Sequence, residues 1–398
     1  MKANIGVFFG GRSVEHEISV ISALQTIQAI DRNRYEVTPI YISKSGHWYT
    51  GDLLLEVDNY RNLEELLKNS TKIVMSPNFE EYTFVESNAK GLFKKPLKGK
   101  IDIAFPVLHG SFGEDGAIQG LFELMGIPYV GCNVLSSAVG MDKIMMKMVL
   151  KESAIPVVDY VWFYSKNWQQ DIDKHIQKVE AKLGYPVIVK PANLGSSVGI
   201  KKANNREELE EAVDYASSFA HKLLVERTIV DLKEINCSVL GNYESAIAST
   251  CEEPLMSGEI LSYQDKYVSK GGSKGMTSTK RKLPAEIPAE MSDKIKQLAI
   301  DTFQTLGCAG VSRIDFLLDQ ATNDIYVNEI NTIPGSLSFY LWEATDKNFN
   351  QLVNDLIDTA FKNYREKNNL TFSYDETNIF SMSGSGSGKN GGMKLSKS

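Results

Sequence analysis

The sequence is poor in cysteine, and the few cysteines it has lie far apart. Only four occur among 398 residues, at Cys132, Cys237, Cys251 and Cys308, and no two of them form a C-x-x-C pair. Such spacing indicates neither a zinc site nor a disulfide framework. We therefore interpret all four as small apolar residues of the protein interior.

Long apolar runs are also missing. No stretch approaches the length of a membrane span, and the first residues, MKANIGVFFGGRS, lack the regions of a signal peptide. We expect a cytoplasmic protein without a membrane partner. The formal net charge of -7, with both signs mixed, argues against a nucleic-acid surface. The hydrophobic content of 42% and the length predict two or three domains with sizeable cores.

The N-terminal segment has the pattern of a parallel βαβ unit. An apolar strand at 4–9 runs into a glycine turn, a helix follows at about 15–30, and a second strand is expected at 35–42. The turn does not have the spacing of the dinucleotide fingerprint. Glu15, at the start of the helix, has two equally weighted interpretations: it caps the helix or complements its dipole, or it holds an ammonium group.

A buried strand at 101–107 ends in the turn HGSFGEDG, which is followed by a helix at 117–125 and a strand at 128–131. His109, the first residue of that turn, either bonds local backbone or takes part in chemistry. The first domain is expected to end near residue 135. A single helix is then predicted at about 136–152, and on it Lys147 is interpreted as solvent-facing.

A lysine and a loop of small residues predict a phosphate site. The strand at 186–190 ends at Lys190, and residues 192–199 read ANLGSSVG. Backbone amides of such a loop can converge on a phosphate, and the Lys190 ammonium can reach the same anion. The P-loop spacing is absent, so the site differs from that of P-loop proteins.

Two acidic residues, Glu226 and Glu234, lie on strands predicted at 223–226 and 234–240. At the rim of a cleft they could accept hydrogen bonds from an adenine amine and from ribose hydroxyls; elsewhere they would be surface charges. A polar, glycine-bearing insertion follows at 260–283. Its tyrosines favour a lid over a solvated linker.

The stretch 312–335, SRIDFLLDQATNDIYVNEINTIPG, is the most informative one. It predicts a hairpin with strands at 311–318 and 325–330. Alternate side chains of a strand share a face, so Arg313 points with Asp315, and Glu329 points with Asn331. Their apolar neighbours argue against a simple solvent-exposed face of the hairpin, because carboxylates buried among apolar residues need a cation or another partner that neutralises them. Few, hard oxygen ligands that leave room for phosphate suit magnesium.

The order of these parts resembles that of the ATP-grasp superfamily. More narrowly, seven motifs resemble those of the D-alanine:D-alanine ligases and occur in that family's order: GGRSVEHEIS, HGSFGEDGAIQG, MDK, VIVKPANLGSSVG, YQDKY, SRIDF and NEINTIPG. The resemblance covers roughly residues 3–365. It implies an α/β protein, α+β in its ATP-grasp part. The implied divisions are a Rossmann-like parallel-sheet domain at 1–135, ATP-grasp subdomains at 136–222 and 223–370, with the lid at 260–283, and a disordered tail at 371–398.

The resemblance implies three groups of site residues. Residues implied to handle the first D-alanine and the reacting groups are Glu15, His109, Ser196, Lys266, Tyr267 and Arg313. Residues implied to contact ATP are Lys143, Lys190, Ser197, Glu226 and Glu234. Residues implied to bind two Mg²⁺ ions, with Mn²⁺ as a possible substitute, are Asp315, Glu329 and Asn331.

The implied reaction makes D-alanyl-D-alanine for peptidoglycan precursors, and hence for cell wall and cell shape. One D-alanine carboxylate attacks the ATP γ-phosphoryl group, and the amine of a second D-alanine attacks the resulting acylphosphate. The family also implies a homodimer. The lid is more basic than usual, and Tyr340 stands where a serine is expected. The acceptor could therefore be D-serine, whereas the absence of a histidine after His221 disfavours D-lactate. The sequence is also compatible with another ATP-grasp carboxylate-amine ligase or with a non-catalytic nucleotide sensor.

Overall fold

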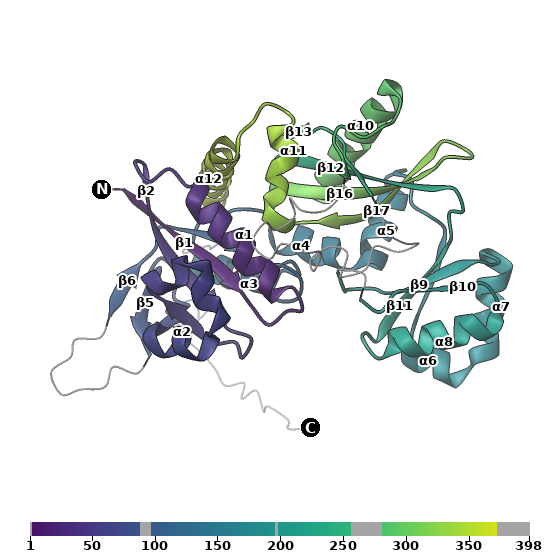
Figure 1. The fold of residues 1–398 in the computed structure, drawn as a ribbon, viewed down its shortest axis with the longest axis horizontal. Helices are drawn as coiled ribbons and strands as arrows, with labels where there is room; N and C mark the ends of the chain where they lie inside the picture. Colours follow the sequence, from purple (N-terminus) through teal and green to yellow (C-terminus); the bar gives the residue numbers. More distant parts are fainter. Residues whose placement is uncertain (1, 88–96, 196–197, 256–280, 372–398) are drawn as a thin grey trace, which may run out of the picture.

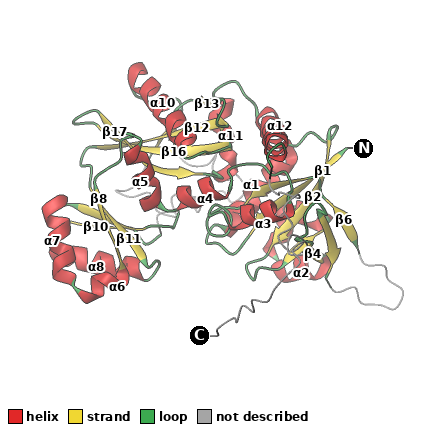
Figure 2. Cartoon of the chain, turned by 180° about the vertical axis from the view of Figure 1, so that it is seen from behind, coloured by secondary structure: helices red, strands yellow, loops and turns green. Residues whose placement is uncertain are grey.

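The computed structural model describes residues 2–87, 97–195, 198–255 and 281–371. Three units, each built on one sheet, make up the molecule (Figure 1). Figure 2 shows the same three sheets from behind, with helices lying against them. The sheets have seven, four and four strands, and a small two-stranded sheet lies beside the third.

The first unit confirms the predicted parallel arrangement. Its strands follow the order β6-β5-β4-β3-β2-β1-β7, and β1 pairs in parallel with both β2 and β7. The elements are β1 (Ala3–Gly10), α1 (His16–Ala29), β2 (Tyr35–Ile42), β3 (Trp48–Thr50), α2 (Leu63–Asn69), β4 (Thr71–Met75), β5 (Thr83–Glu86), β6 (Lys98–Lys100), β7 (Ile103–Val107) and α3 (Ala117–Met125).

Local chemistry fixes the end of β1. Ile5 to Gly10 are all buried, as expected for a strand covered on both faces. Gly10 has φ +88°, and a Cβ there would lie 2.3 Å from the Ile42 carbonyl oxygen, so only glycine fits this turn. The predicted strand at 128–131 is wrong: only an isolated bridge between Tyr129 and Ala104 forms.

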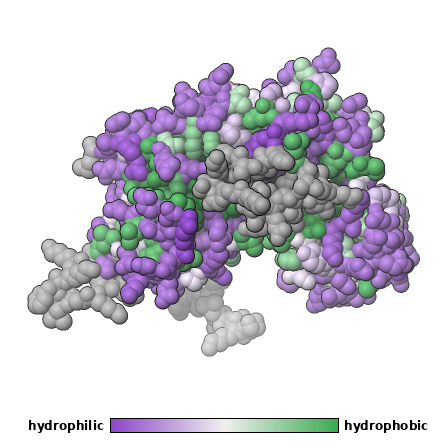
Figure 3. Space-filling model, in the orientation of Figure 1, coloured by the Kyte–Doolittle hydropathy of each residue, from purple (hydrophilic) through white to green (hydrophobic). Residues whose placement is uncertain are grey.

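The second unit lies at the lower right of Figure 1. Its antiparallel sheet has the order β10-β9-β11-β8, and apolar residues of α7 and α8 form one core with it. Figure 3 shows an almost entirely hydrophilic surface over this unit. Its elements are β8 (Tyr160–Tyr164), α6 (Ser165–Gln170), α7 (Ile172–Lys182), β9 (Val187–Pro191), β10 (Lys201–Ala203), α8 (Arg206–Ser217) and β11 (Lys222–Arg227).

The third unit contains the sheet β13-β12-β16-β17. Its elements are β12 (Leu232–Gly241), β13 (Ala246–Ala248), β14 (Glu253–Pro254), β15 (Arg281–Lys282), α10 (Ala289–Thr305), β16 (Gly310–Asp319), β17 (Asp324–Asn331), α11 (Phe339–Glu343) and α12 (Phe349–Asn368). Because β11 pairs between β9 and β8, we propose ending the second unit after Arg227 rather than at residue 222. The other predicted domain limits stay predictions.

The single helix predicted at 136–152 is two helices, α4 (Val134–Met141) and α5 (Lys143–Glu152). Asp142 separates them because its carboxylate accepts hydrogen bonds from the amides of Ile144 and Met145, both at 3.0 Å, and thereby caps α5. Met146 and Leu150 of α5 belong to the core under the third sheet. Ile144 of the same helix packs with Ala192 and Leu224 of the second unit, so α5 links the second unit to the third.

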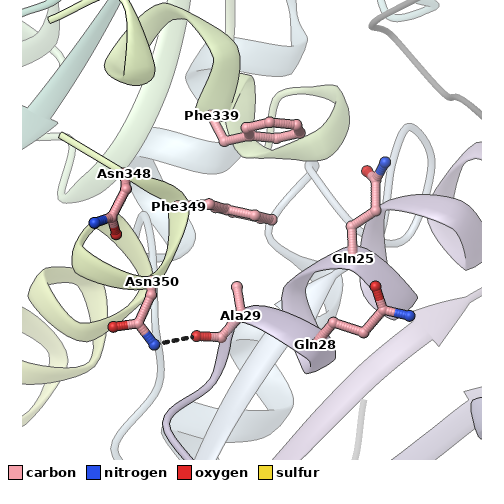
Figure 4. A pocket seen from close by; sticks show the side chains of 7 residues that line it. All are labelled: Gln25, Gln28, Ala29, Phe339, Asn348, Phe349 and Asn350. Atoms are coloured by element: carbon pink, nitrogen blue, oxygen red, sulfur yellow. Dashed lines mark hydrogen bonds between the residues drawn. The ribbon is translucent and has the colours of Figure 1, made fainter. Parts of the chain in front are cut away.

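The last helix returns to the first unit. Residues of α1 and α12 share one hydrophobic core. Between α1 and the start of α12 lies a cavity of about 550 Å³, shown in Figure 4. The rings of Phe339 and Phe349 stack 4.5 Å apart at its wall, and the Asn350 amide donates to the Ala29 carbonyl at 2.7 Å.

All four cysteines are buried and free, which confirms their interpretation as interior residues. Among the described helices, none combines the length and the apolar character needed to cross a membrane.

Candidate active site

The predicted hairpin is confirmed as β16 and β17. Asp315 lies opposite Glu329 and Arg313 lies opposite Asn331, with a bulge just after Asp315. The alternating residues Ile314 and Phe316 are buried in the core, so the polar set faces away from it.

The polar set is held in a definite geometry. The Arg313 guanidinium donates to both Asp315 carboxylate oxygens, at 2.6 and 2.8 Å. The Asn331 amide donates to Asp315 Oδ2 at 3.1 Å. Burial lowers the pKa of Arg313, but Asp315 raises it well above its ordinary value, so the guanidinium stays charged.

A cavity of about 460 Å³ lies between the second and third sheets. Six of the predicted site residues line it: Lys143, Lys190, Glu226, Glu234, Asp315 and Glu329. Apolar residues complete the wall, among them Ile188, Leu232 and Phe316. Charged side chains of both signs thus converge on one wall beside an apolar part, a combination that can fix the orientation of a small charged molecule.

Two lysines approach the acidic end of this cavity. The Lys143 ammonium lies 3.0 Å from Glu329 and donates to the Leu194 carbonyl at 2.9 Å. The Lys190 ammonium donates to the Asn328 side chain at 3.1 Å. The two ammonium groups can neutralise the charge of a phosphate chain, and the two carboxylates can neutralise the charge of a metal ion beside it.

The interpretation of Lys147 as solvent-facing is wrong. Its side chain is 0% exposed, and its ammonium lies 2.6 Å from Glu226 Oε1. The Lys190 ammonium lies 2.5 Å from the other oxygen of the same carboxylate. Burial alone would raise the pKa of Glu226, but Lys147 and Lys190 lower it to about 2. Glu226 therefore fixes the position of Lys190, and any nucleotide contact of Glu226 would come in addition to these ion pairs.

A second cluster joins the first unit to the segment after β17. The His109 ring bonds the Ile333 carbonyl through Nδ1 at 2.8 Å and the Ser22 hydroxyl through Nε2 at 2.9 Å. The Ser336 amide donates to the same hydroxyl at 2.9 Å. Burial lowers the pKa of His109, so the ring is neutral. Its partner is thus distant backbone, not the local backbone considered from the sequence.

Glu114 belongs to this cluster and was missed in the sequence. Its carboxylate accepts from the Ile333 amide at 2.8 Å and from the Gly110 amide at 2.9 Å. Burial, and then the charge of Glu15, raise the pKa of Glu114 to about 8. His109 and Glu114 together hold both backbone groups of Ile333. The only signal in the sequence is an acid inside the turn that follows a buried strand.

Glu114→Gln is expected to change how folding stability depends on pH. Because the folded pKa of about 8 exceeds the ordinary 4.5, Glu114 makes the folded state lose stability as pH rises through this window. One such group contributes a slope of up to about 1.4 kcal/mol per pH unit. Urea unfolding at several pH values between about 5 and about 8 measures this slope of the unfolding free energy. Asp115→Asn in the same turn is the control, and a wild-type slope in Glu114→Gln would contradict the assignment.

Glu15 lies near both glycine-containing loops. It occupies the N-cap position of α1, but its side chain makes no capping hydrogen bond. A Cβ on Gly110 would lie 2.7 Å, and one on Gly195 3.2 Å, from Glu15 Oε2. The structure therefore brings the first unit and the predicted phosphate loop together at this carboxylate.

Four predicted site residues lie outside the described residues: Ser196, Ser197, Lys266 and Tyr267. So do most of the predicted lid, apart from 281–283, and all but the first residue of the predicted tail. Their predicted roles stay predictions.

The residues on the cavity wall fit a magnesium ion. In the described ranges, no group of three or more His, Cys, Asp or Glu side chains could hold a metal by itself. The wall instead offers the facing carboxylates of Asp315 and Glu329, with the amide of Asn331 beside them. Mg²⁺ is often held by one or two carboxylates, with water and phosphate oxygens completing its shell.

Comparisons with known proteins show similarity to one family along nearly the whole chain. The family description "D-ala D-ala ligase N-terminus" matches residues 4–132, and "D-ala D-ala ligase C-terminus" matches residues 149–358. The D-alanine–D-alanine ligase of Thermosipho melanesiensis is 43% identical over 377 residues, which are 94% of this chain and 98% of that protein. That of Acetivibrio thermocellus is 41% identical over 385 residues, 94% and 99% of the two chains.

Solved structures show the same similarity in three dimensions. The D-alanine-D-alanine ligase from Coxiella burnetii superimposes with a TM-score of 0.75 at 30% identity, covering 92% of this chain and 96% of that one. The VanG D-Ala:D-Ser ligase from Enterococcus faecalis gives a TM-score of 0.76 at 33% identity, covering 90% and 100%.

Proposed function

Because the chain belongs to the D-alanine–D-alanine ligase family, we propose that it joins two D-alanine molecules in a reaction that converts ATP to ADP and phosphate. The product, D-alanyl-D-alanine, would serve peptidoglycan synthesis in the cytoplasm. One observation carries the proposal: a single cavity combines Lys143 and Lys190 with the facing carboxylates of Asp315 and Glu329. Cations and metal-binding carboxylates on one wall are what transfer of a phosphoryl group requires.

The first step transfers the γ-phosphoryl group to the carboxylate of the first D-alanine. Lys143 and Lys190 would neutralise the phosphate oxygens, and Asp315, Glu329 and Asn331 would hold two Mg²⁺ ions, or Mn²⁺. When bound, these ions supply charge neutralisation and alignment of the transferring group. The apolar part of the same cavity would take the adenine and ribose, with Glu234 and Glu226 at its edge and Ser197 in the phosphate loop.

The second step forms the peptide bond. Glu15 would hold the ammonium of the first D-alanine, with His109 near it and with Ser196 and Tyr267 as further predicted contacts. The second amine attacks the acylphosphate carbonyl, and Arg313 would stabilise the developing oxyanion because it is charged and rigidly held by Asp315. Lys266 is predicted to reach the transferred phosphate.

D-serine is the second candidate acceptor. Tyr340 stands at a position where the family resemblance leads us to expect a serine, and a solved D-Ala:D-Ser ligase superimposes with a TM-score of 0.76. An acceptor pocket for D-serine need differ only by one hydrogen bond. A homodimer is proposed from the family alone.

An acceptor panel tests the proposal. With ATP, magnesium and D-alanine as the donor, we expect phosphate release and a new dipeptide with D-alanine, and less with D-serine. Mass spectrometry identifies the product. Phosphate release that is independent of D-alanine, or none at all with either acceptor, would refute the ligase assignment. Use of an unrelated acid instead would indicate a different ATP-grasp ligase.

A further inference from the structure

A buried carboxylate outside the nucleotide cavity is not used by the reaction described above. Glu252 is 3% exposed and forms an isolated bridge with Asn236. Its Oε1 accepts from the Asn236 amide at 3.0 Å and from the Tyr340 hydroxyl at 2.8 Å. Its Oε2 accepts from Arg281 at 3.1 Å. A buried charge with three donors is rigidly placed.

Tyr340 and Arg281 complete this cluster. The Arg281 guanidinium carbon lies 3.9 Å from the centroid of the Tyr340 ring, a close cation–π contact. Burial, together with the charge of Glu252, raises the pKa of Tyr340, so its hydroxyl keeps its proton and donates to Glu252. The plane of a guanidinium that is stacked on a ring and hydrogen-bonded at its edge has little freedom.

The cluster adjoins the reacting end of the site. Asn236 lines the nucleotide cavity and pairs across the strands with Asp315. Glu252 accepts hydrogen bonds from both Arg281 and Asn236. Arg281 is therefore linked to the strand of Asp315 through the side chains of Glu252 and Asn236.

We propose that Arg281 binds the carboxylate of the acceptor amino acid, and that Glu252 and Tyr340 are the residues that position Arg281 for this contact. The proposal rests on the ligase function stated above. An acceptor amino acid brings its own anion to the reacting carbonyl, and that anion needs a cation with fixed geometry. A planar guanidinium matches a carboxylate better than an ammonium does.

Three other cations near the site have different partners. Lys143 and Lys190 lie on the wall of the nucleotide cavity with Glu329 and Glu226. Arg313 gives two donors to Asp315 on the metal-binding strand. Arg281 instead pairs with a carboxylate that does not line that cavity. It also stacks on Tyr340, the residue that replaces the expected serine.

Arg281→Met in the full-length protein tests the proposal. Phosphate release as a function of D-alanine concentration gives separate Michaelis constants for donor and acceptor. We expect the acceptor constant to rise about tenfold to a hundredfold, as for loss of a charge-assisted hydrogen bond, while the donor and ATP constants stay within about twofold. Arg281→Lys should recover part of the loss. Lys282→Met, which alters the next lysine on the same short strand, is the matched control.

A second acceptor distinguishes a loss of carboxylate recognition from a general loss of enzyme activity. D-alaninamide has the amine but no carboxylate, so its use should be the same in Arg281→Met as in the wild type. Tyr340→Phe keeps the ring under Arg281 but removes the bond to Glu252, and should raise the acceptor constant several-fold. An unchanged acceptor constant in Arg281→Met, or an equal loss with D-alaninamide, overturns the proposal. A wild-type protein without D-alanine-dependent phosphate release would instead overturn the ligase function itself.

Discussion

Glu226→Ala is expected to lower the free energy of unfolding by about 3 to 5 kcal/mol, the cost of breaking a buried ion pair. Glu226 is 2% exposed and lies between the ammonium groups of Lys147 and Lys190. Its removal leaves two buried cations side by side without their shared counter-charge. Urea denaturation followed by circular dichroism measures the loss.

Glu234→Ala is the matched control for Glu226→Ala. Glu234 lines the same cavity from β12 but is only partly buried. We expect its replacement to change the unfolding free energy by less than about 1 kcal/mol. Equal losses in the two variants would show that the ion pairs of Glu226 with Lys147 and Lys190 do not stabilise the fold. Glu226 would then be understood as a nucleotide contact alone.

The hairpin of β16 and β17 could be predicted because its information is local. Strict alternation of Arg313 and Asp315 with Ile314 and Phe316 assigns the two faces of the strand, and the polar turn sets the register of the residues beside it. The exact pairing was not predictable: the register set by the turn would place Asp315 opposite Asn328, and the bulge just after Asp315 shifts it by one residue, to Glu329. The information for the parallel β1–β2 unit is local as well, since strand, glycine turn and helix follow one another directly.

The orientation of Lys147 could not be predicted from its helix. Helix α5 places Met146 and Leu150 in the core of the third sheet, while Lys147 meets Glu226 of the second. A helix between two sheets has no solvent-facing side at such a position, and the sequence does not show which sheets will flank it. The break at Asp142 was also missed, although the residue type is a common helix cap.

Partners distant in sequence account for the other omissions. Glu114 and Ile333 are 219 residues apart, and Tyr340 and Glu252 are 88 residues apart. Each contact depends on how the units are arranged, so no local pattern reveals it. Tyr340 was noticed only because it departs from the pattern of the resembling family, and its hydrogen bond to Glu252 required coordinates.

Glu329→Ala is expected to reduce kcat by about a thousandfold or more while leaving the fold intact. The carboxylate faces Asp315 across the hairpin and lies 3.0 Å from Lys143, so the variant would lose a proposed metal ligand together with the ion-pair partner of Lys143. Its side chain is 21% exposed at the cavity wall, whereas the neighbours that pack in the core, Val327 and Ile330, are unchanged. Phosphate release over a range of magnesium concentrations measures the loss.

Asp324→Ala, at the exposed other end of β17, is the matched control and should keep activity within about twofold. Titration with Mn²⁺, followed by electron paramagnetic resonance in the presence of ADP, separates metal binding from chemistry. Glu329→Ala should weaken Mn²⁺ binding by at least about tenfold, since a carboxylate ligand is lost rather than reoriented. Normal turnover at ordinary magnesium, or undiminished Mn²⁺ binding, would mean that the metal is held elsewhere. The two facing carboxylates would then serve only to fix Lys143 and Arg313.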